Sequence, residues 1–140
     1  MAGLQNKDAG VSAADTLSIM GSMWHPDMRD DVLKWVLYAF PWGVPNTPLA
    51  KYKGPRQWQR EEMANITEHI RENKLRIERG ETPLVYKFAM TSGRGPGKSA
   101  FVAMVTLWYM SCVLGGTAIL SANNDTQLAG KTFGEIGKWK

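Results

Sequence analysis

The sequence has few residues of the kinds that form disulfides and metal sites. Cys112 is the single cysteine, so an internal disulfide is excluded, which suits a reducing compartment. The only histidines, His25 and His69, have no neighbours at metal-ligand spacing, and a zinc-type site is not expected. The position of Cys112 within an apolar segment predicts that it packs in the core and is not a nucleophile.

The sequence also lacks a long apolar run and an export signal. The longest apolar run, residues 100–114, is interrupted by hydroxyl residues and is shorter than the roughly 20 residues of a membrane-spanning helix. Residues 1–22 lack the basic start and apolar centre of a signal peptide. With 140 residues and a net charge of +4, the chain suits one domain, and the mild charge does not identify an acidic partner. We expect a cytoplasmic protein without a membrane segment.

The first half of the sequence predicts helices. Residues 1–25 are small and polar without a sustained period, and predict a flexible arm. Residues 26–40 carry apolar side chains at helical spacing up to Pro41, and residues 41–55, with four of the seven prolines, predict an extended connector. Residues 55–80 predict an amphipathic helix. Close to one of its faces lie Trp58, Glu62, Ile66, Ile70 and Ile77, with Met63 beside this face.

The second half alternates between two patterns. Residues 84–90, "LVYKFAM", and residues 117–122, "TAILSA", have the short, β-branched composition of strands. Between them lie a glycine-rich turn, residues 91–97, and an apolar helix, residues 98–114. A further helix is expected to begin at residues 123–125. This order predicts an α/β fold with two strands in one parallel sheet and a right-handed crossover.

The turn has the chemistry of a phosphate-binding loop. A glycine-rich turn at the start of a helix gathers backbone N–H groups at the positive end of the helix dipole, where an anion binds. Lys98 has the position from which an amine reaches terminal phosphates, and the Ser99 hydroxyl has the position that ligates Mg²⁺.

The loop departs from the pattern G-x-x-x-x-G-K-[ST] in one position. Ser92 stands where the first glycine belongs, while Gly97 and the two residues after it match. Gly93 and Gly95 partly compensate for the missing glycine. The alternative is a glycine-rich loop that merely joins two elements.

The segment "TSGRGPGKSA" resembles the phosphate loop of the large terminase subunits of tailed bacteriophages, ATP-driven motors that cut and package viral DNA. That family has a small residue in place of the first glycine and an arginine inside the loop, and Ser92 and Arg94 fit both features. The resemblance implies a P-loop NTPase-type parallel sheet flanked by helices, incomplete at the C-terminus, with ATP and Mg²⁺ as cofactors. It implies catalytic roles for Arg94 and Lys98, nucleotide contacts from Gly93, Gly95, Pro96, Gly97, Lys98 and Ser99, and a metal-ligand role for Ser99.

Upstream, "GPRQWQ" resembles the adenine-recognition element of the same family, Pro-x-x-x-Gln. Pro55 and Gln59 have that spacing, and a glutamine amide can both donate to and accept from the adenine edge. The alternative is a polar residue in the first turn of a helix. Trp58 is expected in the core and not as a stacking platform.

Some parts of such a motor are missing from the sequence. No apolar run is followed by the acidic pair that would hold Mg²⁺ and activate water, and no acidic cluster for a nuclease is recognisable. We therefore expect a truncated chain that does not turn over ATP alone, with an arm at 1–25, a helical lead-in at 26–82 and the start of an ATPase core at 83–140. Two strands without their neighbours also predict poor solubility.

The resemblance further implies partners and a setting. These are double-stranded DNA, the portal protein, the small terminase subunit and a ring of identical subunits, all in the cytoplasm of the bacterial host. Two alternatives stay open: a fragment of a DEAD-like helicase or another P-loop ATPase, and a non-catalytic assembly module. The last alternative predicts that Lys98 and Arg94 can be changed without effect.

Overall fold

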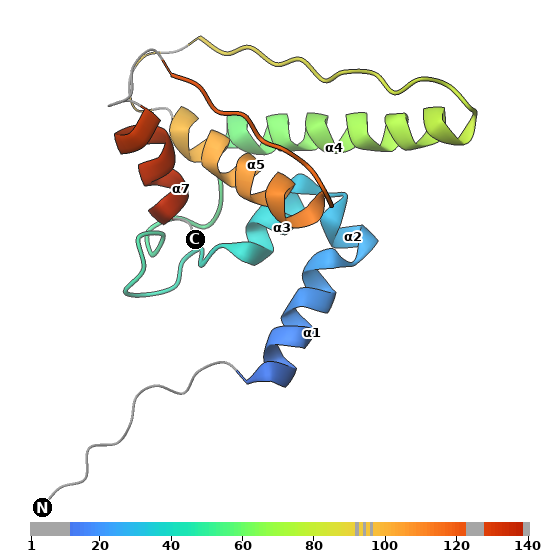
Figure 1. Cartoon of the computed structure of the whole chain (residues 1–140). Helices are drawn as coiled ribbons and strands as arrows, with labels where there is room; N and C mark the ends of the chain where they lie inside the picture. Colours follow the sequence, from blue (N-terminus) through green and yellow to red (C-terminus); the bar gives the residue numbers. More distant parts are fainter. Residues whose placement is uncertain (1–11, 92, 94, 96, 123–127, 139–140) are drawn as a thin grey trace, which may run out of the picture.

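A computed structural model of the chain describes residues 12–91, 93, 95, 97–122 and 128–138. Within these residues the regular structure is helical (Figure 1). The elements are α1 (Ala13–Trp24), α2 (Pro26–Arg29), α3 (Val32–Ala39), α4 (Gln57–Glu78), α5 (Lys98–Cys112), the π-helix η1 (Leu128–Phe133) and α7 (Gly134–Lys138). None of the described helices is both long enough and apolar enough to cross a membrane.

The core lies where α3, α4 and α5 meet. Met63 of α4 and Met104 of α5 are almost completely buried, and Val36 of α3 packs in the same cluster. The indole N–H of Trp108 donates to the carbonyl of Arg29 at 2.8 Å, which ties α5 to the end of α2. The remaining buried apolar members are Val32, Trp35, Phe40, Leu49, Phe101 and Cys112. The predicted packing role of Cys112 is thus confirmed.

Helix α4 confirms the predicted amphipathic helix and starts and ends within two residues of its expected bounds. Glu62 of the predicted face and Met63 beside it are buried, as is Thr67, which was not assigned to that face, but Ile77 is 58% exposed. The reason is visible in Figure 1, where the last turns of α4 extend beyond α3 and α5 and have no helix to pack against.

The single helix predicted before Pro41 is divided into α2 and α3. Asp31 is extended, with φ −114° and ψ 100°, and its carboxylate accepts from the backbone N–H of Lys34 at 2.9 Å. Thr67 of α4 accepts from the backbone N–H of Val32 at 3.1 Å. Because these side chains satisfy the N–H groups of a new helix start, the chain restarts at Val32 instead of continuing from α2.

Helix α1 lies in the region where the sequence predicted an arm without regular structure. The hydroxyl of Ser12 caps it by accepting from the N–H of Asp15 at 3.1 Å. The helix buries none of its residues and projects from the helical body in Figure 1. Its end is held by the indole of Trp24, which donates to the carbonyl of Ser111 at 2.9 Å.

The predicted parallel sheet is wrong: no strand forms among the described residues, and the fold they adopt is all-α. Residues 84–90 and 117–122 are without regular structure and do not pair with each other. The N–H and the carbonyl of Leu84 instead bond to the side-chain amide of Asn73. A β-branched run favours extended backbone, but a sheet needs a neighbouring strand to take up its N–H and C=O groups.

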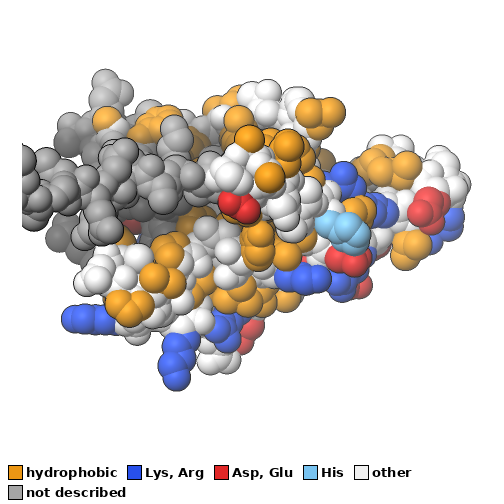
Figure 2. Space-filling view, turned by 90° about the horizontal axis from the view of Figure 1, so that it is seen from below, with side chains coloured by type: hydrophobic (Ala, Val, Ile, Leu, Met, Phe, Trp, Pro, Cys, Tyr) orange, Lys and Arg blue, Asp and Glu red, His pale blue; other side chains and the backbone are white. Residues whose placement is uncertain are grey.

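Without a sheet, apolar side chains of these two segments stay at the surface. Val85 is 78% exposed and Ile119 is 89% exposed. Other elements expose apolar side chains as well, and Figure 2 shows hydrophobic side chains between the charged ones on the face seen from below.

Candidate functional site

The glycine-rich turn leads directly into α5, as the sequence predicted. Gly95 and Gly97 have φ values of +88° and +87°, a left-handed conformation that side-chain-bearing residues rarely adopt. Gly97 is the N-cap of α5, and its carbonyl accepts from the N–H of Phe101 at 2.9 Å. The glycines therefore set the path by which the chain enters the helix.

The N-terminus of α5 presents backbone N–H groups to the turn. Because the N-cap residue is glycine, no side chain caps this helix end. Lys98 is in the first turn, and its Nζ donates to the carbonyl of Gly93 at 3.2 Å, so that its amine lies over the turn. Ser99 is exposed beside it. A positive helix end and an amine at one turn favour an anion there.

Gln59, in the first turn of α4, reaches this turn from the other side. Its side chain is buried, its Oε1 accepts from the backbone N–H of Arg56 at 2.8 Å, and its Nε2 donates to the carbonyl of Gly97 at 2.8 Å. A Cβ at position 97 would lie 2.9 Å from the Gln59 Nε2, so contact with this amide also requires glycine there. The structure thus brings together two sequence elements that lie 38 positions apart.

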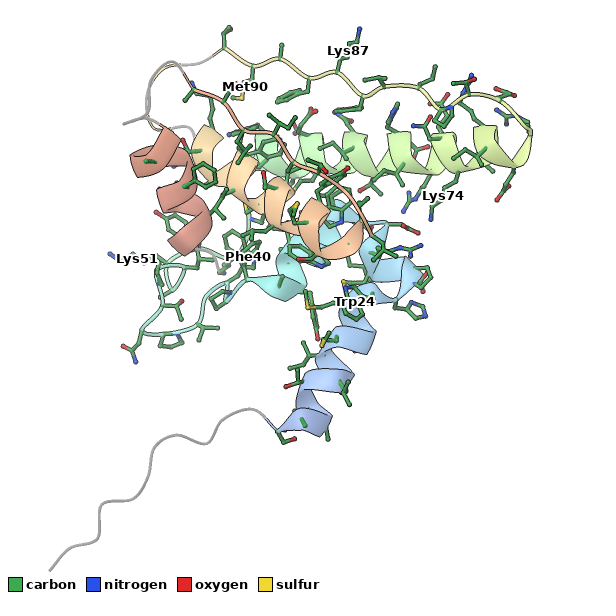
Figure 3. All side chains as sticks on the ribbon, viewed as in Figure 1. Trp24, Phe40, Lys51, Lys74, Lys87 and Met90 are labelled. Carbon is green, nitrogen blue, oxygen red and sulfur yellow. The ribbon has the colours of Figure 1, made fainter. Side chains whose placement is uncertain are left out.

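A pocket of about 340 Å³ opens beside Gln59 and Gly97. Its walls come from the connector after α3, from the start of α4, from one face of α5 and from α7. Most of the wall is apolar, and Phe40, labelled in Figure 3, is part of it. The lining residues are Phe40, Pro41, Trp42, Pro48, Leu49, Tyr52, Gly54, Pro55, Arg56, Gln59, Gly97, Ala100, Met104 and Glu135.

The sequence did not predict this pocket, because the proline-rich residues 41–55 were interpreted only as a connector. The signal was present in its apolar side chains. Leu49 is 5% exposed, and Trp42 is half-buried with its indole N–H donating to the carbonyl of Val36 at 2.9 Å. Large apolar side chains of this kind are not expected in a solvent-exposed linker but are expected in the wall of a pocket.

Several expected site residues lie outside the described part of the chain. They are Ser92, Arg94 and Pro96 of the turn. Residues 123–127, where the last helix was expected to begin, also lie outside the described residues but were not expected to be part of the site. The expected contributions of Arg94 and Pro96 to a nucleotide site therefore stay predictions. The described site consists of Gln59, Gly93, Gly95 and residues 97–99.

The other singled-out residues have structural roles. Burial raises the pKa of the Cys112 thiol to about 11, so that it stays protonated at neutral pH. Trp58 is half-buried, with its ring centroid 5.2 Å from that of Phe101, which agrees with the expected core position. His69 lies at 2.9 Å from the carbonyl of Leu84 through its Nε2. In the described residues, no group of three or more histidine, cysteine or acidic side chains is arranged to hold a metal ion.

Comparisons with protein families, with curated proteins and with solved structures found no match. The functional interpretation therefore depends on the residues themselves. Its physical basis is a glycine turn at a helix N-terminus, a lysine over that turn, and a buried glutamine that joins the turn to an apolar pocket.

Proposed function

We propose that this chain binds ATP, with the phosphates at residues 93–99 and the adenine base in the pocket beside Gln59. We further propose that it does so as the ATP-binding part of a DNA-packaging motor of the large terminase type. The observation that carries the proposal is the hydrogen bond from Gln59 to the carbonyl of Gly97 at 2.8 Å. It joins the two sequence elements that were interpreted as base-recognising and phosphate-binding.

The phosphate half of the proposal draws on charge and backbone geometry. The two left-handed glycines curve the chain in front of α5, and the helix end supplies N–H donors and a positive dipole. The Lys98 amine is close enough to the turn to bond the Gly93 carbonyl, and a phosphate oxygen can replace that carbonyl as its acceptor. Ser99 would then supply a hydroxyl ligand to Mg²⁺.

The proposed binding of the adenine base is supported by the pocket and by the hydrogen-bonding groups of Gln59. A volume of about 340 Å³ with a mostly apolar wall suits a flat heteroaromatic ring. One N–H of the Gln59 amide donates to Gly97 and one lone pair accepts from Arg56, which leaves one donor and one acceptor on the same amide. Adenine offers a matching acceptor and donor, N7 and the N6 amino group.

The proposal does not use a P-loop sheet, since the strand expected before the turn does not form. It concerns ATP binding and not turnover by this chain, because no apolar run in the sequence is followed by an acidic pair for Mg²⁺ and water. Arg94 is proposed to contact the terminal phosphates. DNA, the portal protein, the small terminase subunit and further copies of the chain are the proposed partners of the motor.

The test is equilibrium binding of a fluorescent ATP analogue in the presence of Mg²⁺. Lys98→Ala is expected to weaken binding at least about tenfold, since it removes a charge-assisted hydrogen bond to phosphate. The matched control is Lys87→Ala, because Lys87 is exposed and points away from the helices in Figure 3; its affinity should equal that of the wild type. Far-UV circular dichroism checks the helical content of each protein. A folded wild-type chain that does not bind the analogue would overturn the proposal.

A further inference from the structure

The pocket is lined by one acidic residue, Glu135, which has no role in the proposed function. Glu135 lies on α7, is half-buried, and carries the single carboxylate among the described residues that line the pocket. Helix α7 packs against α5, and Figure 1 shows it beside the end of α5 at which the glycine turn enters. Glu135 therefore contributes to the wall of the pocket from α7, near the start of α5.

A carboxylate at this position does not favour phosphate. Ionised carboxylate accepts hydrogen bonds only, and it repels the negative charges of a triphosphate. Its natural partners are hydroxyl and amino groups, and of these a nucleotide carries the ribose hydroxyls and the adenine N6 amine. The N6 amine is already matched by the Gln59 amide in the proposed pose, whereas the ribose hydroxyls have no other partner in it.

The order of groups along a nucleotide favours the ribose as well. The ribose connects the base to the phosphates, so it must lie between the pocket beside Gln59 and the turn at residues 97–99. Glu135 lines this same pocket together with Gly97 and Ala100 of the α5 start. Acidic side chains that accept from ribose hydroxyls occur in other nucleotide sites, where they distinguish the sugar.

We propose that Glu135 accepts hydrogen bonds from the ribose hydroxyls of the bound nucleotide and makes the pocket selective for ribonucleotides over deoxyribonucleotides. This inference rests on the proposed nucleotide site and adds a specificity residue to it. Glu135 is a residue that neither the phosphate-loop pattern nor the Pro-x-x-x-Gln element includes.

The experiment measures the affinities of ATP, 2′-deoxy-ATP, 3′-deoxy-ATP and inosine triphosphate by competition with the fluorescent analogue. The wild-type chain should bind ATP about tenfold more tightly than at least one of the deoxy nucleotides, as expected for a hydrogen bond to a charged acceptor. Glu135→Ala should abolish this preference. Glu135→Gln, which keeps a neutral acceptor, should retain a preference of about threefold.

The readout is the ratio of affinities and not the affinity for ATP, because removing a negative charge strengthens the binding of every triphosphate. Glu78→Ala is the matched control, since Glu78 is exposed at the far end of α4 and should leave all the ratios unchanged. Thermal unfolding shows whether each variant is folded. If Glu135→Ala does not fold, the test depends on Glu135→Gln.

Each outcome separates this inference from the proposed function. A wild-type chain that binds none of the nucleotides overturns the proposed function. Equal affinities of the wild type for ATP and both deoxy nucleotides overturn the role of Glu135 while ATP binding stands. A change in the ratio of ATP to inosine triphosphate, with the deoxy ratios unchanged, places Glu135 at the base and also overturns the inference.

Discussion

The helical body and the extended segment after it are held together in different ways. In α3, α4 and α5 the backbone hydrogen bonds are internal to each helix, and the helices meet over a shared apolar core. Residues 82–91, which we call the strap, have no such internal bonds and run along α4 in Figure 1. The difference shows that a segment of strand-like composition can be ordered by the side chains of a helix.

Four side chains of α4 hold the strap. Arg76 donates to the carbonyl of Thr82 at 3.0 Å. The Asn73 amide donates to the carbonyl of Leu84 at 2.9 Å and accepts from its N–H at 2.8 Å, as a neighbouring strand would. His69 contacts the same carbonyl. The hydroxyl of Tyr86 donates to the buried carboxylate of Glu62 at 2.5 Å. These contacts are few, so we expect the strap to loosen before the helical body unfolds.

The largest expected effect on stability comes from a substitution in the core. It would weaken the packing that distinguishes the helical body from the strap. Met63→Ala should lower the free energy of unfolding by about 2–5 kcal/mol, because it leaves a cavity between α3, α4 and α5. Urea unfolding followed by far-UV circular dichroism measures this. Met110→Ala is the control: Met110 is 55% exposed on α5, and its removal should cost less than about 0.5 kcal/mol. Equal costs for both variants would contradict the assigned core.

An intermediate effect is expected from the bond between the strap and α4 that involves Glu62. Tyr86→Phe should cost about 1–2 kcal/mol at pH 8, since among the described residues the buried carboxylate then keeps only the contact from the Asn65 amide at 3.3 Å. Tyr52→Phe, at a tyrosine that is 52% exposed, should cost much less.

This effect should depend on pH in a specific direction. Burial, and then the bond to Glu62, raise the pKa of Tyr86 to about 12 from the ordinary value of 10.0. The folded state therefore holds the phenol proton more tightly than the unfolded state, and this stabilisation is complete below pH 10 and is lost as the pH rises to about 12. The stability gap between the wild type and Tyr86→Phe should narrow over that interval. A gap that stays constant to pH 12 would show that the bond does not form.

The smallest effect on global stability is expected from a substitution that loosens the strap and leaves the helical body unchanged. Asn73→Ala should change the global stability by less than about 1 kcal/mol, since water can replace its partly exposed hydrogen bonds. The N–H of Leu84 should nevertheless exchange with solvent about tenfold faster. Amide hydrogen exchange followed by NMR measures this rate, and the amides of Met104 and Trp108 in α5 serve as internal controls that should not change.

The sequence predicted α4 and α5 well because their information is local. The apolar period around Met63, the glycine before Lys98 and the glycines after Cys112 act within a few residues. The break at Asp31 was missed, since it depends partly on Thr67, which lies 35 positions from Val32. Local patterns thus fix helices better than they fix the breaks between them.

The sheet was mispredicted and the pocket was not predicted, for a related reason. The composition of residues 84–90 favours extended backbone, but it does not say whether a strand or the Asn73 side chain takes up the N–H of Leu84. Of the site, the turn and Gln59 could be found as motifs. Glu135 could not, because only the packing of α7 on α5 brings it to the pocket.

The length of α4 determines how long the strap must be to bring the chain back to the start of that helix. Its 22 residues span about 33 Å at 1.5 Å per residue. The strap spans roughly the same distance in half as many residues, at about 3.3 Å each. One extended run therefore carries the chain from the end of α4 back to Gln59, with the glycine turn beginning where the helix began. If one residue were added to the strap, the end of the strap would pass Gln59 by about 3.3 Å. If one residue were added to α4 instead, the end of the strap would stop about 1.5 Å before Gln59. The lengths of the two segments are therefore matched.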